Sequence, residues 1–299
     1  MNIEKAKTII LYVVEKTKPK WEKYDEDWDN VDEVFIRRGY EQGGFECWKF
    51  AEQLKKHGIF SINSIGQILD NLDKEKCSGK KYDRAFAGSL LKPLYQNMKC
   101  GECGAEGCEF YKCVEDFKGN KGLMFWKLLW QMLVCCNYLK NNYNGSFSNF
   151  LKSKYCEFKK ISKITDSDFL SISPEDWEQF KKDKKHWKDE YLSGIGENVF
   201  DFIVGDIKQA KFVMNSFKLD SANEHFLKTT GISKLIENLN QVNVVNFLKK
   251  LNLPYTIREI NKGIYTYCSK TESQNFGFCR NRRKCDECKI YDLCEKNFN

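Results

Sequence analysis

Eight of the fourteen cysteines in this 299-residue chain fall into two clusters whose short spacing is typical of metal sites. The C-terminal cluster has the pattern C-x5-C-x2-C-x5-C and consists of Cys279, Cys285, Cys288 and Cys294. Four thiolates at such spacing in a reducing compartment predict a structural iron–sulfur cluster or a zinc ion. The spacing alone leaves these two open.

A short basic segment fills the gap between the first two of these cysteines. It contains Arg280, Arg282, Arg283 and Lys284. If a metal centre pins the flanking cysteines, this segment forms a compact loop that can contact DNA phosphates, with an affinity that falls as the salt concentration rises. The alternative is a set of solvated charges on a C-terminal tail.

The second cluster, C-x2-C-x4-C-x4-C, interrupts a long helical pattern. It consists of Cys100, Cys103, Cys108 and Cys113. Its Lys-Cys-Gly-Glu-Cys-Gly stretch resembles a zinc knuckle, so we expect an insertion that is stapled by zinc or by a second iron–sulfur cluster. The six remaining cysteines are expected to be small buried residues.

Two further features could act on DNA. The segment Leu-Ser-Gly-Ile-Gly, with Gly194 and Gly196, predicts a tight turn between two helices. Such a helix-hairpin-helix element binds a phosphate through free backbone N–H groups without reading bases. An ordinary turn between helices is the alternative.

Asp220 stands directly before a predicted helix. Ser221 and Glu224 form an S-x-x-E pattern, which predicts a helix that begins at Ser221 with Asp220 directly before it. Its carboxylate then lies near the positive end of the helix, which favours the ionised form. The alternative is that Asp220 only starts the helix.

The elements that must position these residues are helices. Apolar residues recur at steps of three and four along most of the chain, and only four prolines occur, so we expect a nearly all-α protein. The expected helices span residues 3–16, 29–41, 45–57, 62–71, 82–97, 122–142, 146–153, 173–190, 197–205, 207–216, 221–229, 233–239 and 242–251.

Composition narrows the class of protein. The formal net charge of +7 favours polyanionic partners, and the aromatic content of 14% indicates a globular chain. The most apolar run, from Leu123 to Cys136, contains Lys127 and Gln131 and is too short to span a bilayer. The N-terminus lacks the features of a signal peptide. We therefore expect a soluble cytoplasmic protein, associated with the nucleoid if prokaryotic, with no membrane partner.

The order of these motifs resembles the helix-hairpin-helix DNA glycosylase superfamily, in the endonuclease III-like branch with a C-terminal iron–sulfur cluster. The resemblance covers roughly residues 28–80 and 120–299. The spacing of Cys285, Cys288 and Cys294 matches that branch, whereas the first cysteine gap is one residue shorter. The family's V-D-T-H motif corresponds here to residues 219–222, Leu-Asp-Ser-Ala.

The resemblance implies an all-α fold in which two helical domains flank a DNA-binding cleft. The expected domains are an N-terminal helix that packs with the C-terminal cluster domain (1–27), the first part of a helical barrel (28–98), a four-cysteine metal-binding insertion (99–121), the rest of the barrel with the hairpin and the catalytic Asp (122–230), and a C-terminal helical iron–sulfur domain (231–299).

The resemblance also implies an activity and roles for single residues. The enzyme would flip a damaged or modified base out of double-stranded DNA and hydrolyse its N-glycosidic bond at Asp220. Gln42 would fill the vacated space, with Asn137 as second choice. Asn198 stands where strand-nicking members have a lysine, so we expect a monofunctional glycosylase. A 4Fe-4S cluster would occupy the C-terminal site, and the protein would act as a monomer.

Three alternatives stay open. The first is a DNA-binding protein that has kept the scaffold without catalysis. The second is a bifunctional glycosylase and abasic-site lyase that uses a displaced amine, with Lys211 and Lys218 as the nearby candidates. The third is a redox-sensing or electron-transfer protein, since an iron–sulfur cluster can serve either purpose.

Overall fold

All regular structure among the described residues is helical. The computed structural model describes residues 1–26, 30–41, 48–71, 109–183, 192, 195, 200, 203, 215–270, 276–280 and 282–298. No strand occurs in these ranges, so the expectation of an all-α chain is confirmed for them. The helix expected at 82–97 lies outside them.

The chain forms two compact units, each assembled from separate stretches of sequence. Unit 1 consists of Met1–Asp29, Thr165–Lys182 and Val204–Asn299. Unit 2 consists of Asn30–Ile164 and Asp183–Ile203.

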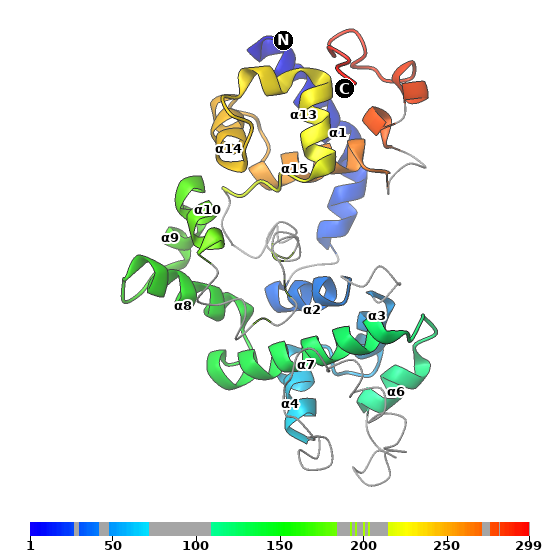
Figure 1. Ribbon diagram of the computed structural model, residues 1–299, viewed down its shortest axis with the longest axis vertical. Coiled ribbons are helices and arrows are strands. Elements are labelled where there is room, and N and C mark those ends of the chain that lie inside the picture. Colours follow the sequence, from blue (N-terminus) through cyan, green and yellow to red (C-terminus); the bar gives the residue numbers. More distant parts are fainter. Residues whose placement is uncertain are drawn as a thin grey trace. The chain divides into compact units, whose positions relative to one another are not determined.

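Unit 1 joins the N-terminal helix to the C-terminal part of the chain (Figure 1). Its helices are α1 (Ile3–Glu26), α9 (Asp166–Leu170), α10 (Pro174–Lys182), α13 (Ser221–Thr230), α14 (Gln241–Lys250) and α15 (Ile257–Cys268), and its 3-10 turns are η3 (Ile232–Leu235), η5 (Phe278–Arg280) and η6 (Arg282–Cys285).

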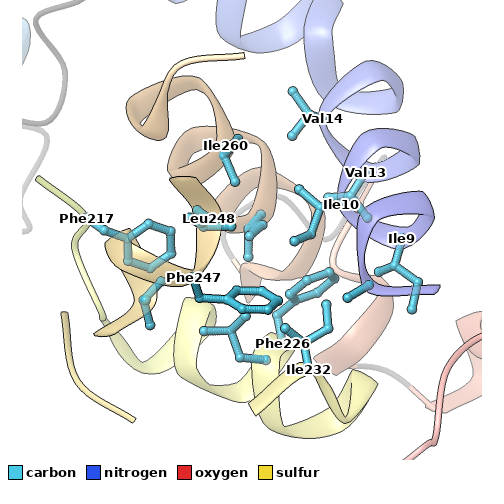
Figure 2. Close-up of a cluster of buried hydrophobic side chains, with 14 of the residues drawn as sticks. Ile9, Ile10, Val13, Val14, Phe217, Phe226, Ile232, Phe247, Leu248 and Ile260 are labelled. Atoms are coloured by element: carbon cyan, nitrogen blue, oxygen red, sulfur yellow. The ribbon is translucent and has the colours of Figure 1, made fainter. Parts of the chain in front are cut away.

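The core of unit 1 lies between α1, α13, α14 and α15. Figure 2 shows apolar side chains of these helices that point toward one another, including Ile10 and Val13 of α1 and Phe226 of α13. Helices α1 and α15 approach closely at Gly263, where a Cβ atom would lie 3.0 Å from the Val14 Cα. Burial of such side chains removes apolar surface from water, which is the main force that holds α13 in place.

Unit 2 is built around a long helix that packs on several shorter ones. Its helices are α2 (Val31–Glu41), α3 (Trp48–Lys56), α4 (Ile62–Asn71), α6 (Glu109–Asp116), α7 (Leu123–Tyr143) and α8 (Phe147–Lys159). Helices α4 and α7 approach closely at Gly66, where a Cβ atom would lie 2.7 Å from the Cys136 carbonyl oxygen. The side chain of Asn137 donates to the Gly66 carbonyl and to Asp70, so its role here is to join α7 to α4.

Several elements differ from those expected. Helix α15 was not predicted, although Thr256 and Glu259 form a complete capping box at its start. Helix α6 lies within the expected insertion, and α1 continues to Glu26 through Pro19. Residues 165–182 and 204–230, which the sequence assigned to the barrel, belong to unit 1, because α10 packs on α14 and α13 packs on α15.

Over the described residues, none of the helices combines the length and the apolar character that a membrane span requires.

Candidate functional site

The four C-terminal cysteines surround a single cavity in unit 1. The cavity has a volume of about 20 Å³, and Cys279, Cys285, Cys288 and Cys294 all line it. Thr229 of α13 also lines it, as do Phe278 and Ile290. Residues that are up to 65 positions apart in the sequence therefore meet around one small space, in which sulfur is the predominant side-chain hetero atom.

The four thiols of this cavity are a donor set that suits either an iron–sulfur cluster or a zinc ion. An iron–sulfur cube takes one thiolate for each of its four irons, so its ligands surround a central space, whereas a single zinc ion draws all four thiolates to within about 2.3 Å of one point. The cysteines border a space of about 20 Å³, which does not distinguish these two arrangements. Among the described residues, including these cysteines, no three His, Cys, Asp or Glu side chains lie close enough together to hold a single metal ion.

The thiols of this site raise one another's pKa. Burial raises the pKa of Cys285, and the neighbouring thiols of Cys288 and Cys294 raise it further. The pKa of Cys279 lies well above its usual range, chiefly because of its hydrogen bond with Cys268 and then because of burial. Thiolates this close repel one another, so a positively charged metal group would be needed to hold four of them together.

Two further hydrogen bonds reach the sulfur atoms of this site. The Tyr267 hydroxyl lies 2.9 Å from the Cys288 Sγ. The backbone N–H of Lys296 donates to the Cys294 Sγ at 3.4 Å. Donors to ligand sulfurs orient them and spread their charge. Neither Tyr267 nor Cys268 was singled out by the sequence, since both lie in the helix α15 that was not predicted.

Helix α13 holds the C-terminal tail that carries these cysteines (Figure 1). The backbone N–H groups of Asn297 and Glu295 donate to the carbonyls of Thr229 and Thr230 in its last turn. The ring Nε2 of His225 lies 2.9 Å from the Cys279 carbonyl oxygen. These contacts satisfy carbonyls that would otherwise be unpaired at a helix end, and they tie α13 to both ends of the cysteine segment.

Asp220 stands at the opposite end of α13 and caps it. Its Oδ1 accepts hydrogen bonds from the backbone N–H groups of Ala222 and Asn223, each at 2.9 Å. The helix begins at Ser221 as predicted. The sequence predicted a capping box of Ser221 and Glu224, and this was wrong. Asp220 caps the helix, and Glu224 forms an ion pair with Lys228. Among the described residues, no donor reaches the Asp220 Oδ2.

The turn that leads into Asp220 is clamped from two helices. The side-chain amides of Asn223 and Asn261 both donate to the Lys218 carbonyl, at 2.9 and 3.1 Å. The Lys218 N–H in turn donates to the Asn261 Oδ1. The half-buried carboxylate of Asp220 is therefore held by the backbone on both sides, as a group with a positional task requires.

The basic segment is partly engaged within its own loop. The ammonium group of Lys284 donates to the Phe276 carbonyl at 2.6 Å and lies 5.7 Å from the centre of the Phe278 ring. Lys284 thus braces the loop that joins α15 to the cysteine site. The side chains of Arg280, Arg282 and Arg283 lie outside the described part of the structure, so their role stays a prediction.

Of the second cysteine cluster, only Cys113 is described. It is fully buried on α6, and its thiol donates to the Gln53 carbonyl of α3 at 3.5 Å. The contact beside it was missed in the sequence: the two ring nitrogens of His57 lie 3.0 Å from carboxylate oxygens of Glu109 and Asp116. His57 therefore joins the end of α3 to both ends of α6.

The hairpin is described at two positions. Leu192 and Ile195 are buried, and the Ile195 N–H donates to the Leu192 carbonyl at 3.0 Å, which closes a four-residue turn where one was expected. The other predicted site residues that fall outside the described ranges are Gln42, Gly194, Gly196, Asn198, Cys100, Cys103 and Cys108.

No protein-family model matches this chain, and neither the curated proteins nor the solved structures include one that is significantly similar to it.

Proposed function

We propose that this protein is a monofunctional DNA glycosylase of the helix-hairpin-helix type, with a 4Fe-4S cluster at Cys279, Cys285, Cys288 and Cys294. Its substrate would be a damaged or modified base in double-stranded DNA. The protein would release the base by hydrolysis and leave an intact abasic site.

The observation that carries this proposal is the construction of α13. One end of this helix holds Asp220, with Oδ1 committed to the cap and Oδ2 without a donor among the described residues. The other end borders the cavity of the four cysteines. A carboxylate and a metal-type cysteine site are thus joined by a single rigid element of ten residues, about 15 Å long.

The chemistry assigned to Asp220 follows from the charge that develops during bond cleavage. Loss of the base leaves positive charge on the deoxyribose, and a fixed carboxylate oxygen nearby stabilises it. The same oxygen can orient the attacking water or accept its proton. The clamp on Lys218 limits how far Asp220 can move, so little reorganisation would be needed as the charge appears.

The remaining parts would bind and shape the DNA. The turn at Leu192–Ile195 precedes helical residues, which suits a backbone phosphate contact. Arg280, Arg282 and Arg283 would meet phosphates from the cluster loop. The cluster, when bound, would cross-link the tail and supply no step of the reaction. Asn198 cannot form a Schiff base with the sugar, so no strand nicking would accompany base release.

A second candidate is a DNA-binding protein without catalysis on the same scaffold. The observation that favours it is the cap itself, since Asp is a common N-cap residue and the two hydrogen bonds to Oδ1 account for its presence before α13.

The test is base release from duplex DNA that carries alkylated, deaminated, oxidised and hypermodified bases. We expect the wild type to release a base that mass spectrometry identifies, with strand breaks only after alkali. Asp220→Asn should lower the rate at least about 100-fold, because the catalytic charge is lost, while DNA binding is kept.

Two outcomes decide against parts of the proposal. Base release from none of these substrates favours the non-catalytic protein. Strand breaks without alkali favour a bifunctional enzyme that uses a displaced amine, and substitution of Lys211 or Lys218 by Ala then identifies which lysine acts.

A further inference from the structure

Thr229 carries a buried hydroxyl with no partner. Its side chain is 1% exposed, and no hydrogen bond from its Oγ1 is found within the described residues. A buried polar group without a partner destabilises the folded state, so such groups are rare in native proteins. The hydroxyl is therefore expected to donate to an acceptor that does not belong to the polypeptide.

The neighbouring residue shows that this is not a general property of the helix. Thr230 is also fully buried on α13, but its hydroxyl donates to the Phe226 carbonyl at 2.8 Å. This is the usual way in which a threonine within a helix satisfies itself. Thr229 does not use it, and its own carbonyl accepts from the Asn297 N–H and from the Cys294 thiol.

The cavity that Thr229 lines offers sulfur atoms as acceptors. Thr229 lines the same cavity as Cys279, Cys285, Cys288 and Cys294, and the apolar residues Phe278 and Ile290 complete much of the wall. Thiolate and sulfide sulfurs accept hydrogen bonds from hydroxyl groups. Such bonds stabilise the more negative, reduced state of an iron–sulfur cluster and help to retain its metal.

We propose that the Thr229 hydroxyl donates a hydrogen bond to a sulfur atom of the bound cluster, either a ligand thiolate or an inorganic sulfide. This proposal rests on the 4Fe-4S cluster of the proposed function and adds a residue that no cysteine motif indicates. Because Thr229 and Asp220 belong to one helix, the bond also attaches the helix that carries the carboxylate directly to the cofactor.

The test compares four proteins that are purified without oxygen: the wild type, Thr229→Val, Thr229→Ser and Thr230→Val. Valine keeps the shape of threonine and removes the hydroxyl, serine keeps the hydroxyl, and Thr230→Val removes a buried hydroxyl that faces backbone. The measurements are iron and sulfide content, the midpoint reduction potential, and the rate of iron release to a chelator.

We expect Thr229→Val to have a more negative midpoint potential and to release iron about 10-fold faster, as loss of a second-shell donor does at other metal sites. Thr229→Ser and Thr230→Val should resemble the wild type in both measurements. If Thr229→Val resembles Thr230→Val, or if it only stabilises the protein, the hydroxyl has no cluster partner and the proposal is wrong.

The same samples separate this proposal from the proposed function. Wild-type protein without iron would overturn both the cofactor and the hydrogen bond. If the protein carries a cluster but releases no base, the glycosylase proposal is wrong. The comparison of Thr229→Val with Thr230→Val would still test the hydrogen bond to the cluster.

Discussion

Asp220 would have two tasks in the proposed enzyme, and the structure divides them between its two oxygen atoms. Oδ1 accepts the two backbone hydrogen bonds that start α13, and Oδ2 has no donor among the described residues. An Asn side chain can cap a helix about as well as an Asp, but it carries no charge. Substitution by Asn therefore removes the chemistry and keeps the cap.

For stability, we expect Asp220→Ala to lower the free energy of unfolding by about 1 kcal/mol, because the first turn of α13 loses its cap. Asp220→Asn should stay close to the wild type. Denaturant unfolding followed by circular dichroism measures both. If Asp220→Asn unfolds as readily as Asp220→Ala, loss of base release in that variant would reflect damage to α13 rather than loss of a catalytic charge.

Thr256 offers a matched control for this comparison. It caps α15 in the same unit, and its hydroxyl accepts from the Glu259 N–H. Thr256→Ala should cost a similar amount of stability, about 1 kcal/mol. It should leave base release unchanged, because it removes only the cap of α15 and keeps Asn261, the residue of that helix that clamps the turn before Asp220.

At the level of elements, α13 depends on the tail that crosses its C-terminal end. The helix ends at Gly231, which has a φ of 83° in the left-handed region. A Cβ atom there would collide with the carboxyl group of Glu295, and Glu295 accepts from Lys234 at 2.6 Å. The hydrogen bond from Lys234 is the main reason why the pKa of Glu295 falls to about 2. A side chain at position 231 would therefore require the Glu295 carboxyl group to shift from this position.

We expect Gly231→Ala to lower the stability of unit 1 by more than the cost of placing an alanine in the left-handed conformation. That conformation costs about 1–2 kcal/mol for alanine. Gly58→Ala is the control, since Gly58 has a φ of 72° and no atom within 4 Å of the added Cβ. Hydrogen exchange of the α13 amides should rise in Gly231→Ala and stay unchanged in Gly58→Ala. Equal exchange in the two variants would show that the tail does not hold α13.

At the level of the whole molecule, the surplus of positive charge gives DNA affinity only where it is concentrated. The formal charge of +7 is small for 299 residues, and the described helices carry lysines and carboxylates in many local pairs. The gap Arg280–Lys284 has four basic residues in five positions beside the cysteine site. We therefore expect phosphate contacts from this loop to dominate the salt dependence of binding.

Arg282→Ala and Arg283→Ala should each weaken DNA binding and reduce the slope of log K against log salt by about 1. Lys250→Ala removes one exposed charge from the end of α14 and should leave the slope unchanged. Fluorescence anisotropy with a labelled duplex at several salt concentrations measures this. A similar loss in all three variants would show that net charge, and not the loop, determines binding.

The sequence by itself determined the features that depend on near neighbours in the chain. Helical periodicity predicted the all-α class and the bounds of α4, and the S-x-x-E pattern predicted that α13 begins at Ser221. Local patterns failed where two signals competed. The glycines and cysteines around α6 concealed its helix, and Asp220 took the cap from Ser221 because its carboxylate reaches two N–H groups.

Only the tertiary structure decided which residues meet. The cavity joins Thr229 of α13 to cysteines 50 to 65 positions later, and the contact of Tyr267 with Cys288 crosses from α15 to the tail. The thiol of Cys113 contacts the Gln53 carbonyl of α3, and His57 joins α3 to α6 beside it. The spacing of residues in the sequence determines contacts only between residues that are within one or two helical turns of each other. Longer contacts follow from how the helices bury their apolar faces, and that packing brings Thr229 to the cysteines.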